Sequence, residues 1–487
     1  MNIYKYAINT LLSGLLLTGC NLDFDPTAAV SSSSLSEEDY EYLLIGAYSA
    51  AHNFSMGHQY VIDDICADNL DNAVSPLSTG KFEDYDVCNV QGSSYRLESM
   101  WEELFTALQT TNNAITVMES AEQTEEMMEL IAQAKIIRCW EYQRLVAMWG
   151  DVPLLTEPTN ELVPRDDEEE IWQLMVEDCE YAAEYGPSFS DPAYVSEVAG
   201  KAMLARVLCI APEGVRDLDR AAELAEEVLS YSNFELAADP NTIWLDKNSD
   251  EMIFMFENTT TDGDGISPGW FLRAWEWEIE QFKEAGGDPG KAANGRHMFT
   301  VDMSLFNAFE DGDLRKEASI RDLRCEGHQE TVYLDCIKYP NDTGGYDDPW
   351  PIIRIAEMYL IAAEAKGYPE GVNRLNELRV VRGLNELETG SDITSDNFME
   401  KSMQERRVEL CFEGHRWYDL RRWWNMGTEG QESVLQLRSY QNGEASGSRP
   451  TASDYMNLDD DGHNLLLPLP ASAITNNPNL LPNNPGY

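Results

Sequence analysis

Positive charge is scarce in this sequence. Its 487 residues include 34 lysines and arginines but 87 aspartates and glutamates, which gives a formal net charge of −53 at pH 7. So acidic a surface repels nucleic acids, polyanionic glycans and anionic lipid headgroups at long range. The composition therefore argues against a nucleic-acid partner and against strongly anionic ligands, whereas neutral ligands remain open.

Long hydrophobic runs are also absent after the first twenty residues. The apolar run over 7–17 is too short to span a bilayer and follows the basic residue Lys5, as in the hydrophobic part of a signal peptide. It ends in Leu17-Thr18-Gly19-Cys20, which resembles the lipobox of a bacterial lipoprotein. We therefore expect a signal peptide over 1–19, a lipid-modified Cys20 and a membrane link through acyl chains alone. An ordinary secretory signal with an incidental cysteine is the alternative.

Motifs of enzymes and metal sites are missing as well. The sequence has no HExxH, no GxSxG, no P-loop and no Cys/His set with zinc spacing, so we expect a binding protein rather than an enzyme. The segment 457–462 resembles the start of an EF-hand loop, but Pro468 stands where the bidentate Glu is needed, and 260–265 fails at both ends. Calcium stays open at these loops, and no cofactor is predicted.

Cysteines are few, and eight remain after Cys20. Four lie in helical patterns beside apolar residues and are interpreted as buried free thiols: Cys139, Cys179, Cys209 and Cys411. The others lie in less regular segments. They form two pairs, Cys66/Cys88 and Cys325/Cys336. In an exported protein either pair could be a disulfide, and free thiols are the alternative.

What the sequence does have is helical periodicity. The spacing of apolar residues predicts helices over 37–51, 97–119, 127–149, 168–185, 198–210, 218–231, 352–366 and 370–382. Small residues at the expected crossings, such as Ala221, Ala225 and Ala362, suggest antiparallel pairs with tetratricopeptide-like stacking. We expect a mainly α fold.

Irregular segments interrupt the helices. The polar stretch 20–36 predicts a flexible tether, and 37–487 is expected to form a single domain. Long loop insertions are expected near 58–95, 259–295 and 427–462, where binding loops commonly occur.

Five segments stand out in order along the chain. They are the helix ending in Trp149-Gly150-Asp151 and Pro153, the helix over 351–365 with Arg354 and Glu357, the segment 374–383, the segment 405–423, and the tail from Leu467-Pro468-Leu469-Pro470 to Tyr487. Together they resemble the SusD/RagB family of outer-membrane lipoproteins of Bacteroidetes. The tail departs from the commonest family pattern at Pro482, where Gln is frequent.

The resemblance has several implications. It implies four tetratricopeptide-like units with irregular ligand-binding loops, at the outer face of the outer membrane. It implies capture of oligosaccharides, less often of peptides, and their delivery to a SusC-like TonB-dependent transporter. A lipid-anchored glycosidase is a further alternative.

Aromatic residues in the predicted loops are the candidate ligand contacts. The indoles of Trp270, Trp275 and Trp277 lie close together in a Gly- and Asp-rich segment, and a sugar stacks its C–H face on such rings while carboxylates and amides bind its hydroxyls. The alternative is that these rings pack the loop onto the scaffold.

A second candidate cluster precedes the helix over 97–119. Its location resembles that of the family's binding loops, and the alternative is that its members are ordinary surface residues. They are Tyr60, Asp68, Asn69, Tyr85 and Tyr95.

The segment 406–424 alternates arginine with tryptophan. It also carries acidic residues, and Arg416, Asp419 and Arg422 lie three apart, so that they can pair on one helix face. We interpret this segment as an internal ion-paired brace rather than as a nucleic-acid or glycan site.

Overall fold

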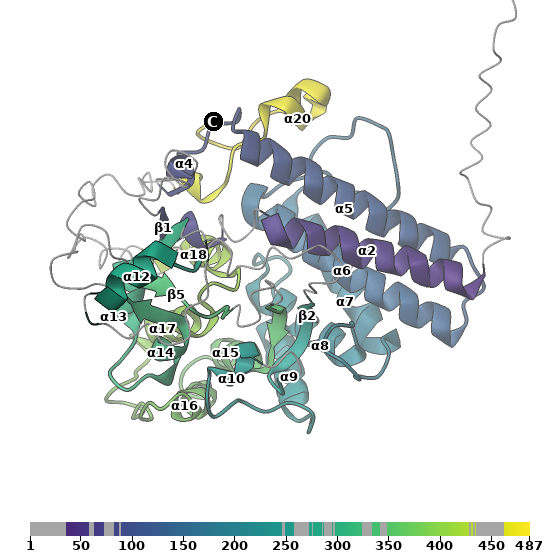
Figure 1. Cartoon of the computed structure of the whole chain (residues 1–487). Coiled ribbons are helices and arrows are strands. Elements are labelled where there is room, and N and C mark those ends of the chain that lie inside the picture. Colours follow the sequence, from purple (N-terminus) through teal and green to yellow (C-terminus); the bar gives the residue numbers. More distant parts are fainter. Residues whose placement is uncertain are drawn as a thin grey trace, which may run out of the picture.

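A computed structural model shows how these segments are arranged (Figure 1). The structure describes residues 36–57, 63–72, 82–86, 89–245, 249–257, 272–274, 276–284, 286, 295, 298–323, 334–340, 348–427, 430–431, 434 and 462–487. The predicted signal peptide and nearly all of the predicted tether lie outside these ranges. In the described part of the chain, no helix is long and apolar enough to cross a bilayer.

Antiparallel helices form the first half of the molecule, and each packs on the next along the chain from α5 to α9. The N-terminal helix α2 runs alongside α5 and α6 and packs on both. Their bounds are α2 Glu37–Gly57, α5 Tyr95–Glu119, α6 Glu125–Trp149, α7 Glu168–Tyr185, α8 Glu197–Ile210 and α9 Leu218–Leu229. The prediction of a mainly α fold is confirmed.

A second helical group follows late in the chain, with α15 Ile355–Lys366, α16 Val372–Val381, α17 Phe398–Leu410 and α18 Arg416–Trp424. Helix α15 packs against α9 and thereby joins the two groups. Ala221 and Ala225 of α9 and Ala362 and Ala363 of α15 are buried, and such small side chains let helix axes approach closely.

Short strands form three antiparallel pairs: β1 Leu70–Asn72 with β3 Phe299–Val301, β2 Met252–Phe256 with β6 Trp350–Arg354, and β4 Ile320–Asp322 with β5 Leu334–Cys336. Strand β6 corrects one prediction. The helix expected from residue 352 begins at Ile355, because Ile352 and Ile353 are β-branched and buried and belong to the strand.

Shorter helices complete the described elements. They are α4 Glu83–Asp86, α10 Thr242–Leu245, α12 Glu276–Glu284, α13 Met303–Ala308, α14 Leu314–Ser319, η4 His463–Leu465, α20 Ala471–Asn476 and η5 Pro478–Leu480. Helix α12 lies within the segment 259–295 that was expected to be irregular, so that segment is partly helical.

The described cysteines are buried. Cys139, Cys179, Cys209 and Cys411 have free thiols, as predicted. Cys336 is also free in this structure, and Cys325, its predicted partner, lies outside the described residues. Cys88, the predicted partner of Cys66, lies outside the described residues, so the Cys66/Cys88 pair stays a prediction.

Candidate functional site

The two segments that carry the predicted ligand contacts meet in the fold. Strand β1 belongs to the segment 58–95, and β3 follows the segment 259–295 directly. They pair with Leu70 opposite Val301 and Asn72 opposite Phe299. Figure 1 shows α4, β1, α12 and β5 gathered at the same end of the molecule. Residues more than 200 positions apart in the sequence therefore lie together. The paired strands are largely buried, and we call the region around them, which includes the start of α5, the junction face.

Aromatic and cationic side chains continue this contact beyond the strands. The rings of Phe82 and Phe299 meet edge to face with centroids 4.8 Å apart, and the Arg96 guanidinium lies 3.9 Å from the Phe82 centroid. A cation over an aromatic face is attracted by the ring quadrupole. The start of α5 is thus tied to β3.

Tyr95 and Tyr85, two of the predicted ligand contacts, differ in exposure. Tyr95 begins α5 and is 76% exposed, so its ring is available to a ligand. Tyr85 is buried, and its hydroxyl lies 3.0 Å from that of Ser94. Burial raises the pKa of Tyr85 above its ordinary value. We therefore do not carry Tyr85 into the proposed ligand surface.

Asp68 and Asn69 are also buried, and they anchor the junction face. The Asp68 carboxylate accepts two hydrogen bonds from the Arg416 guanidinium. The Asn69 carboxamide oxygen accepts from Arg407 Nε at 3.1 Å, and its nitrogen donates to Asp64 at 2.7 Å. Because both side chains are buried and hydrogen-bonded within the protein, we do not include them among the proposed ligand contacts.

The side chains of the three predicted ligand-binding tryptophans are not among those that the structure describes. Trp270, Trp275 and Tyr60 are outside the described residues, and Trp277 is described as part of α12 but without its side chain. The chain beside them is fixed: Ala274 N donates to the Asp335 carboxylate at 2.7 Å, and Gly295 N donates to Ala274 O at 3.0 Å. The two loops at which calcium stays open, 260–265 and 457–462, also lie outside the described residues except for Gly462.

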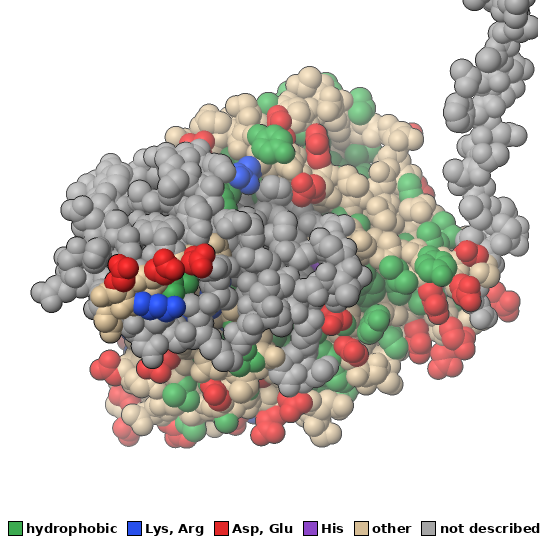
Figure 2. Space-filling model, viewed as in Figure 1, with side chains coloured by type: hydrophobic (Ala, Val, Ile, Leu, Met, Phe, Trp, Pro, Cys, Tyr) green, Lys and Arg blue, Asp and Glu red, His purple; other side chains and the backbone are tan. Residues whose placement is uncertain are grey.

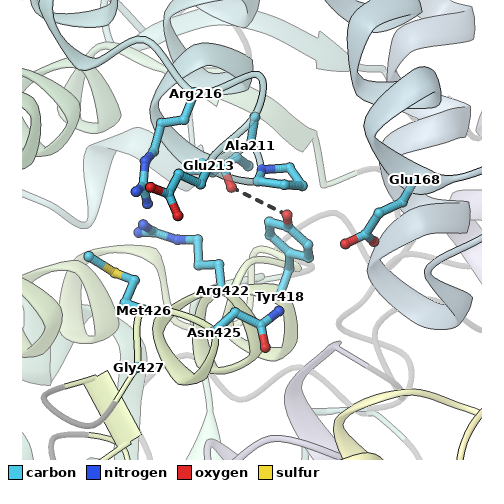
Figure 3. A pocket seen from close by; sticks show the side chains of 11 residues that line it. Glu168, Ala211, Glu213, Arg216, Tyr418, Arg422, Asn425, Met426 and Gly427 are labelled. Carbon is cyan, nitrogen blue, oxygen red and sulfur yellow. Dashed lines mark hydrogen bonds between the residues drawn. The ribbon is translucent and has the colours of Figure 1, made fainter.

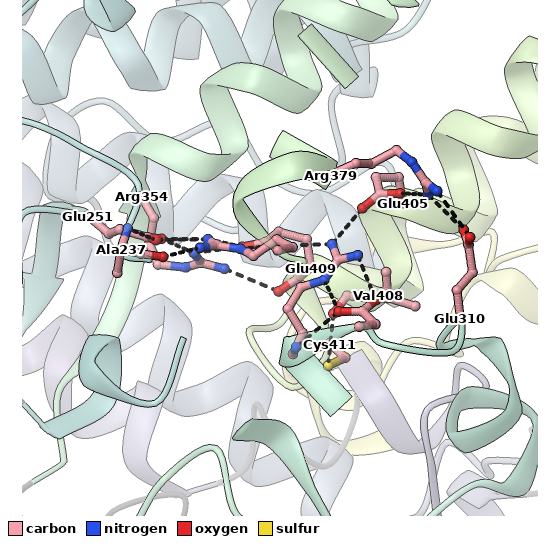
Figure 4. Close-up of polar contacts among 12 residues, drawn as sticks. Ala237, Glu251, Glu310, Arg354, Arg379, Glu405, Val408, Glu409 and Cys411 are labelled. Carbon is pink, nitrogen blue, oxygen red and sulfur yellow. Dashed lines mark hydrogen bonds and ion pairs between the residues drawn. The ribbon is translucent and has the colours of Figure 1, made fainter. Parts of the chain in front are cut away.

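A buried ion network connects β2, β6 and the late helices (Figure 4). Glu251, at the start of β2, and Glu409 of α17 both bind Arg354 and Arg382, at distances of 2.7 to 3.1 Å. Burial opposes the charge on Glu409, but Arg382 and Arg354 outweigh it and hold its pKa well below the ordinary value. Arg354 also reaches Glu413 with two bonds of 2.8 Å. A charged cluster replaces an apolar core at this point.

The predicted brace over 406–424 is present, with one change of partner. Arg422 pairs with Asp419 at 2.8 Å, as the spacing predicted. Arg416 turns away from Asp419 and binds Asp68, whereas Asp419 is bound by Arg406 at 2.8 Å. The brace therefore positions the junction face as well as its own helix.

A polar cavity of about 510 Å³ lies apart from the junction face, between the turn after α8 and the end of α18 (Figure 3). The side chains of Glu213, Arg216 and Arg422 point toward one another around it. Arg422 is held by Asp419 and Glu364, and Tyr418 donates weakly to Ile210 O at 3.3 Å. The third predicted loop begins at Gly427, on the wall of this cavity.

Comparison with known proteins places the chain in a family. Residues 328–487 match the SusD family, and residues 22–208 match the family described as "Starch-binding associating with outer membrane". SusD-like protein P2 of Formosa agariphila is 23% identical over 526 aligned residues, which cover 99% of this chain and 100% of the relative. The chain is a SusD-like protein.

Solved structures share the fold of this SusD-like protein. A laminarin-binding SusD-like protein superposes with a TM-score of 0.71 at 21% identity, over 93% of this chain and 100% of the other. A crystal structure with xylogluco-oligosaccharide superposes with a TM-score of 0.70 at 19% identity, over 90% and 97% of the two chains.

Sequence reasoning missed the anchoring residues of this SusD-like protein. Arg407 and Arg416 contact Asp68 and Asn69 over more than 330 positions, and no local pattern signals a contact at that distance. One signal in the sequence was available: the segment 406–424 is rich in arginine although the chain as a whole is acidic. Cations concentrated in one helical segment of such a chain are expected to have buried carboxylate partners.

Proposed function

We propose that this chain is a carbohydrate-binding lipoprotein of the cell surface that captures neutral oligosaccharides. The observation that carries the proposal is the β1–β3 pair, which joins the two aromatic-rich segments into one face. The family membership supports it, because relatives of the same fold include a laminarin-binding protein and a structure with xylogluco-oligosaccharide.

The junction face has the chemistry for this ligand. Tyr95 offers an exposed ring at the start of α5, and the proposal adds Tyr60, Trp270, Trp275 and Trp277 from the adjoining segments. Aromatic rings stack on the apolar face of a pyranose, and this gain needs no charge on the ligand. A chain of net charge −53 suits such a neutral ligand.

The proposal extends to the membrane and to a partner. Cys20 would carry the lipid, and the tether over 20–36 would let the folded part move as a lid above a SusC-like TonB-dependent transporter. The family description that names association with the outer membrane supports this location. Recovery of no barrel protein with the affinity-purified lipoprotein would contradict the transporter partnership.

Affinity electrophoresis tests the carbohydrate claim and its location together. We expect the protein to be retarded in gels that contain a neutral polysaccharide, and Trp277→Ala and Tyr95→Ala to lose much of that retardation. Arg216→Gln is the matched control, because Arg216 lines the polar cavity and makes no ion pair with any described residue. If Arg216→Gln abolishes binding and the aromatic variants do not, the ligand site is the cavity and the junction face is excluded.

Two other functions make different predictions. A surface peptide carrier would bind oligopeptides in calorimetry and no neutral glycan. A lipid-anchored glycosidase would release reducing ends from glycans that it binds, whereas a binding protein leaves them intact.

A further inference from the structure

Two free thiols touch inside the first helical group. Cys139 of α6 and Cys179 of α7 are fully buried, and their Sγ atoms lie 3.3 Å apart. Sequence alone treats them as separate buried thiols, because they are 40 positions apart.

The neighbouring residues fix the register that brings these sulfurs together. Arg138 and Asp178 each precede one of the cysteines, and they form a buried two-point ion pair, with Nε to Oδ2 and Nη2 to Oδ1 both at 2.7 Å. A bidentate arginine–carboxylate pair holds both side chains in one geometry. The contact between Cys139 and Cys179 is thus specified by the adjacent pair and by helix packing.

We infer that Cys139 and Cys179 of the exported protein are oxidised to a disulfide that links α6 to α7. The inference rests on the export included in the proposed function, because disulfides persist outside the cytoplasm. Two thiols lose two protons and two electrons as the S–S bond forms. The oxidant is a protein thiol oxidase in its disulfide form, which takes up both electrons and both protons and becomes a dithiol.

Burial determines when this reaction occurs. Burial raises the pKa of the Cys179 thiol well above its ordinary value, so the folded protein holds almost no reactive thiolate there. Oxidation therefore takes place while α6 and α7 are still assembling, and the finished bond is shielded from reductants. Closing a loop of this length restricts the unfolded chain, so the bond stabilises the helical scaffold.

Mass spectrometry of the native lipoprotein tests the inference. The protein is purified from the outer-membrane fraction, denatured with an alkylating agent present, and digested with trypsin without reduction. We expect the peptide that begins at Cys139 to be joined to the peptide that contains Cys179, and the pair to separate on reduction. Recovery of both peptides separately and alkylated would overturn the inference.

Thermal unfolding supplies a second readout with matched variants. A reductant applied to the unfolded protein should lower the midpoint temperature of subsequent unfolding of the wild type and of Cys209→Ala. It should lower the midpoints of Cys139→Ala and Cys179→Ala less, since these variants lack the bond between α6 and α7. An equal effect of the reductant on all four proteins would contradict the inference. Glycan binding is measured separately, so failure of the disulfide leaves the proposed function intact.

Discussion

The Asp68 carboxylate accepts two hydrogen bonds from the Arg416 guanidinium, Nε to Oδ1 at 2.6 Å and Nη2 to Oδ2 at 2.7 Å, across 348 positions of the chain. Both side chains are buried. Asp68 lies just before β1, and Arg416 begins α18. This pair therefore fixes the junction face to the most charged part of the scaffold.

Breaking the pair should destabilise the protein strongly. Asp68→Asn keeps the side-chain shape but leaves the buried Arg416 charge without its counter-ion. Loss of one partner of a buried ion pair costs about 3–5 kcal/mol in the free energy of unfolding. Urea unfolding of the soluble part of the chain measures this loss.

The matched control is a surface pair of the same chemistry. Glu180 and Arg220 lie 2.6 Å apart, and each side chain is 43% exposed. Because water screens such a pair, Glu180→Gln should cost less than about 1 kcal/mol. Equal losses for the two variants would show that Asp68 has no special structural role.

Acid should destabilise the protein through the buried network. Arg382 and Arg354 hold the pKa of Glu409 well below its ordinary value despite burial, and Arg354 and Lys338 lower the pKa of Glu413. The stability from these carboxylates is complete above the unfolded-state value of about 4.3 and is lost as the pH falls below it. We expect the free energy of unfolding to drop steeply below about pH 4 and to drop less steeply in Glu409→Gln. An equally steep fall of the free energy of unfolding at low pH in both proteins would contradict this explanation.

A rise in pH should also destabilise the folded protein, through the carboxyl group of Asp64. Burial, with a contribution from the charge of Asp63, raises the pKa of Asp64 to about 7, although the Asn69 amide bond opposes the shift. The folded protein keeps a proton that the unfolded chain releases above about pH 4. Stability should therefore fall as the pH rises from about 4 to about 7, by at most about 1.4 kcal/mol per pH unit from this group.

Asp64→Asn removes this titration. The variant should show a shallower fall of the free energy of unfolding between about pH 4 and pH 7. Some slope should persist, since burial also raises the pKa of Asp302 to about 7. An unchanged slope would mean that Asp64 is charged in the folded protein.

Local patterns predicted the helices well, because apolar spacing records which face of a helix is buried. The bounds of α7 coincide with the prediction. Acidic side chains are visible on the surface, as the composition led us to expect (Figure 2). Partners distant in sequence escaped prediction. Asp68, Asn69 and Tyr85 lie in an irregular segment and were expected at the surface, but tertiary partners bury all three.

The same limit applies to charge. Spacing predicted that Arg416 would pair along its own helix, but Asp68 binds it from another element. The site itself was predictable only as two separate aromatic-rich segments. The β1–β3 register that joins them depends on long-range pairing, which no local pattern reveals.

Lipid anchoring predicts a simple change of compartment. Cys20→Ser removes the thiol that would carry the lipid, so the variant should leave the membrane fraction while its folded part still binds glycan. Immunoblots of fractionated cells and electrophoresis of the released protein measure the two properties. Retention of Cys20→Ser in the outer membrane would contradict a purely lipid anchor.

Calorimetric titration of the soluble protein with defined neutral oligosaccharides, including laminarin and xyloglucan fragments, and with oligopeptides as the contrast, tests the central claim most directly. The account predicts saturable binding of at least one neutral oligosaccharide, weakened at least several-fold by Trp277→Ala and unchanged by Arg216→Gln. Binding of oligopeptides with no response to any neutral glycan would contradict it.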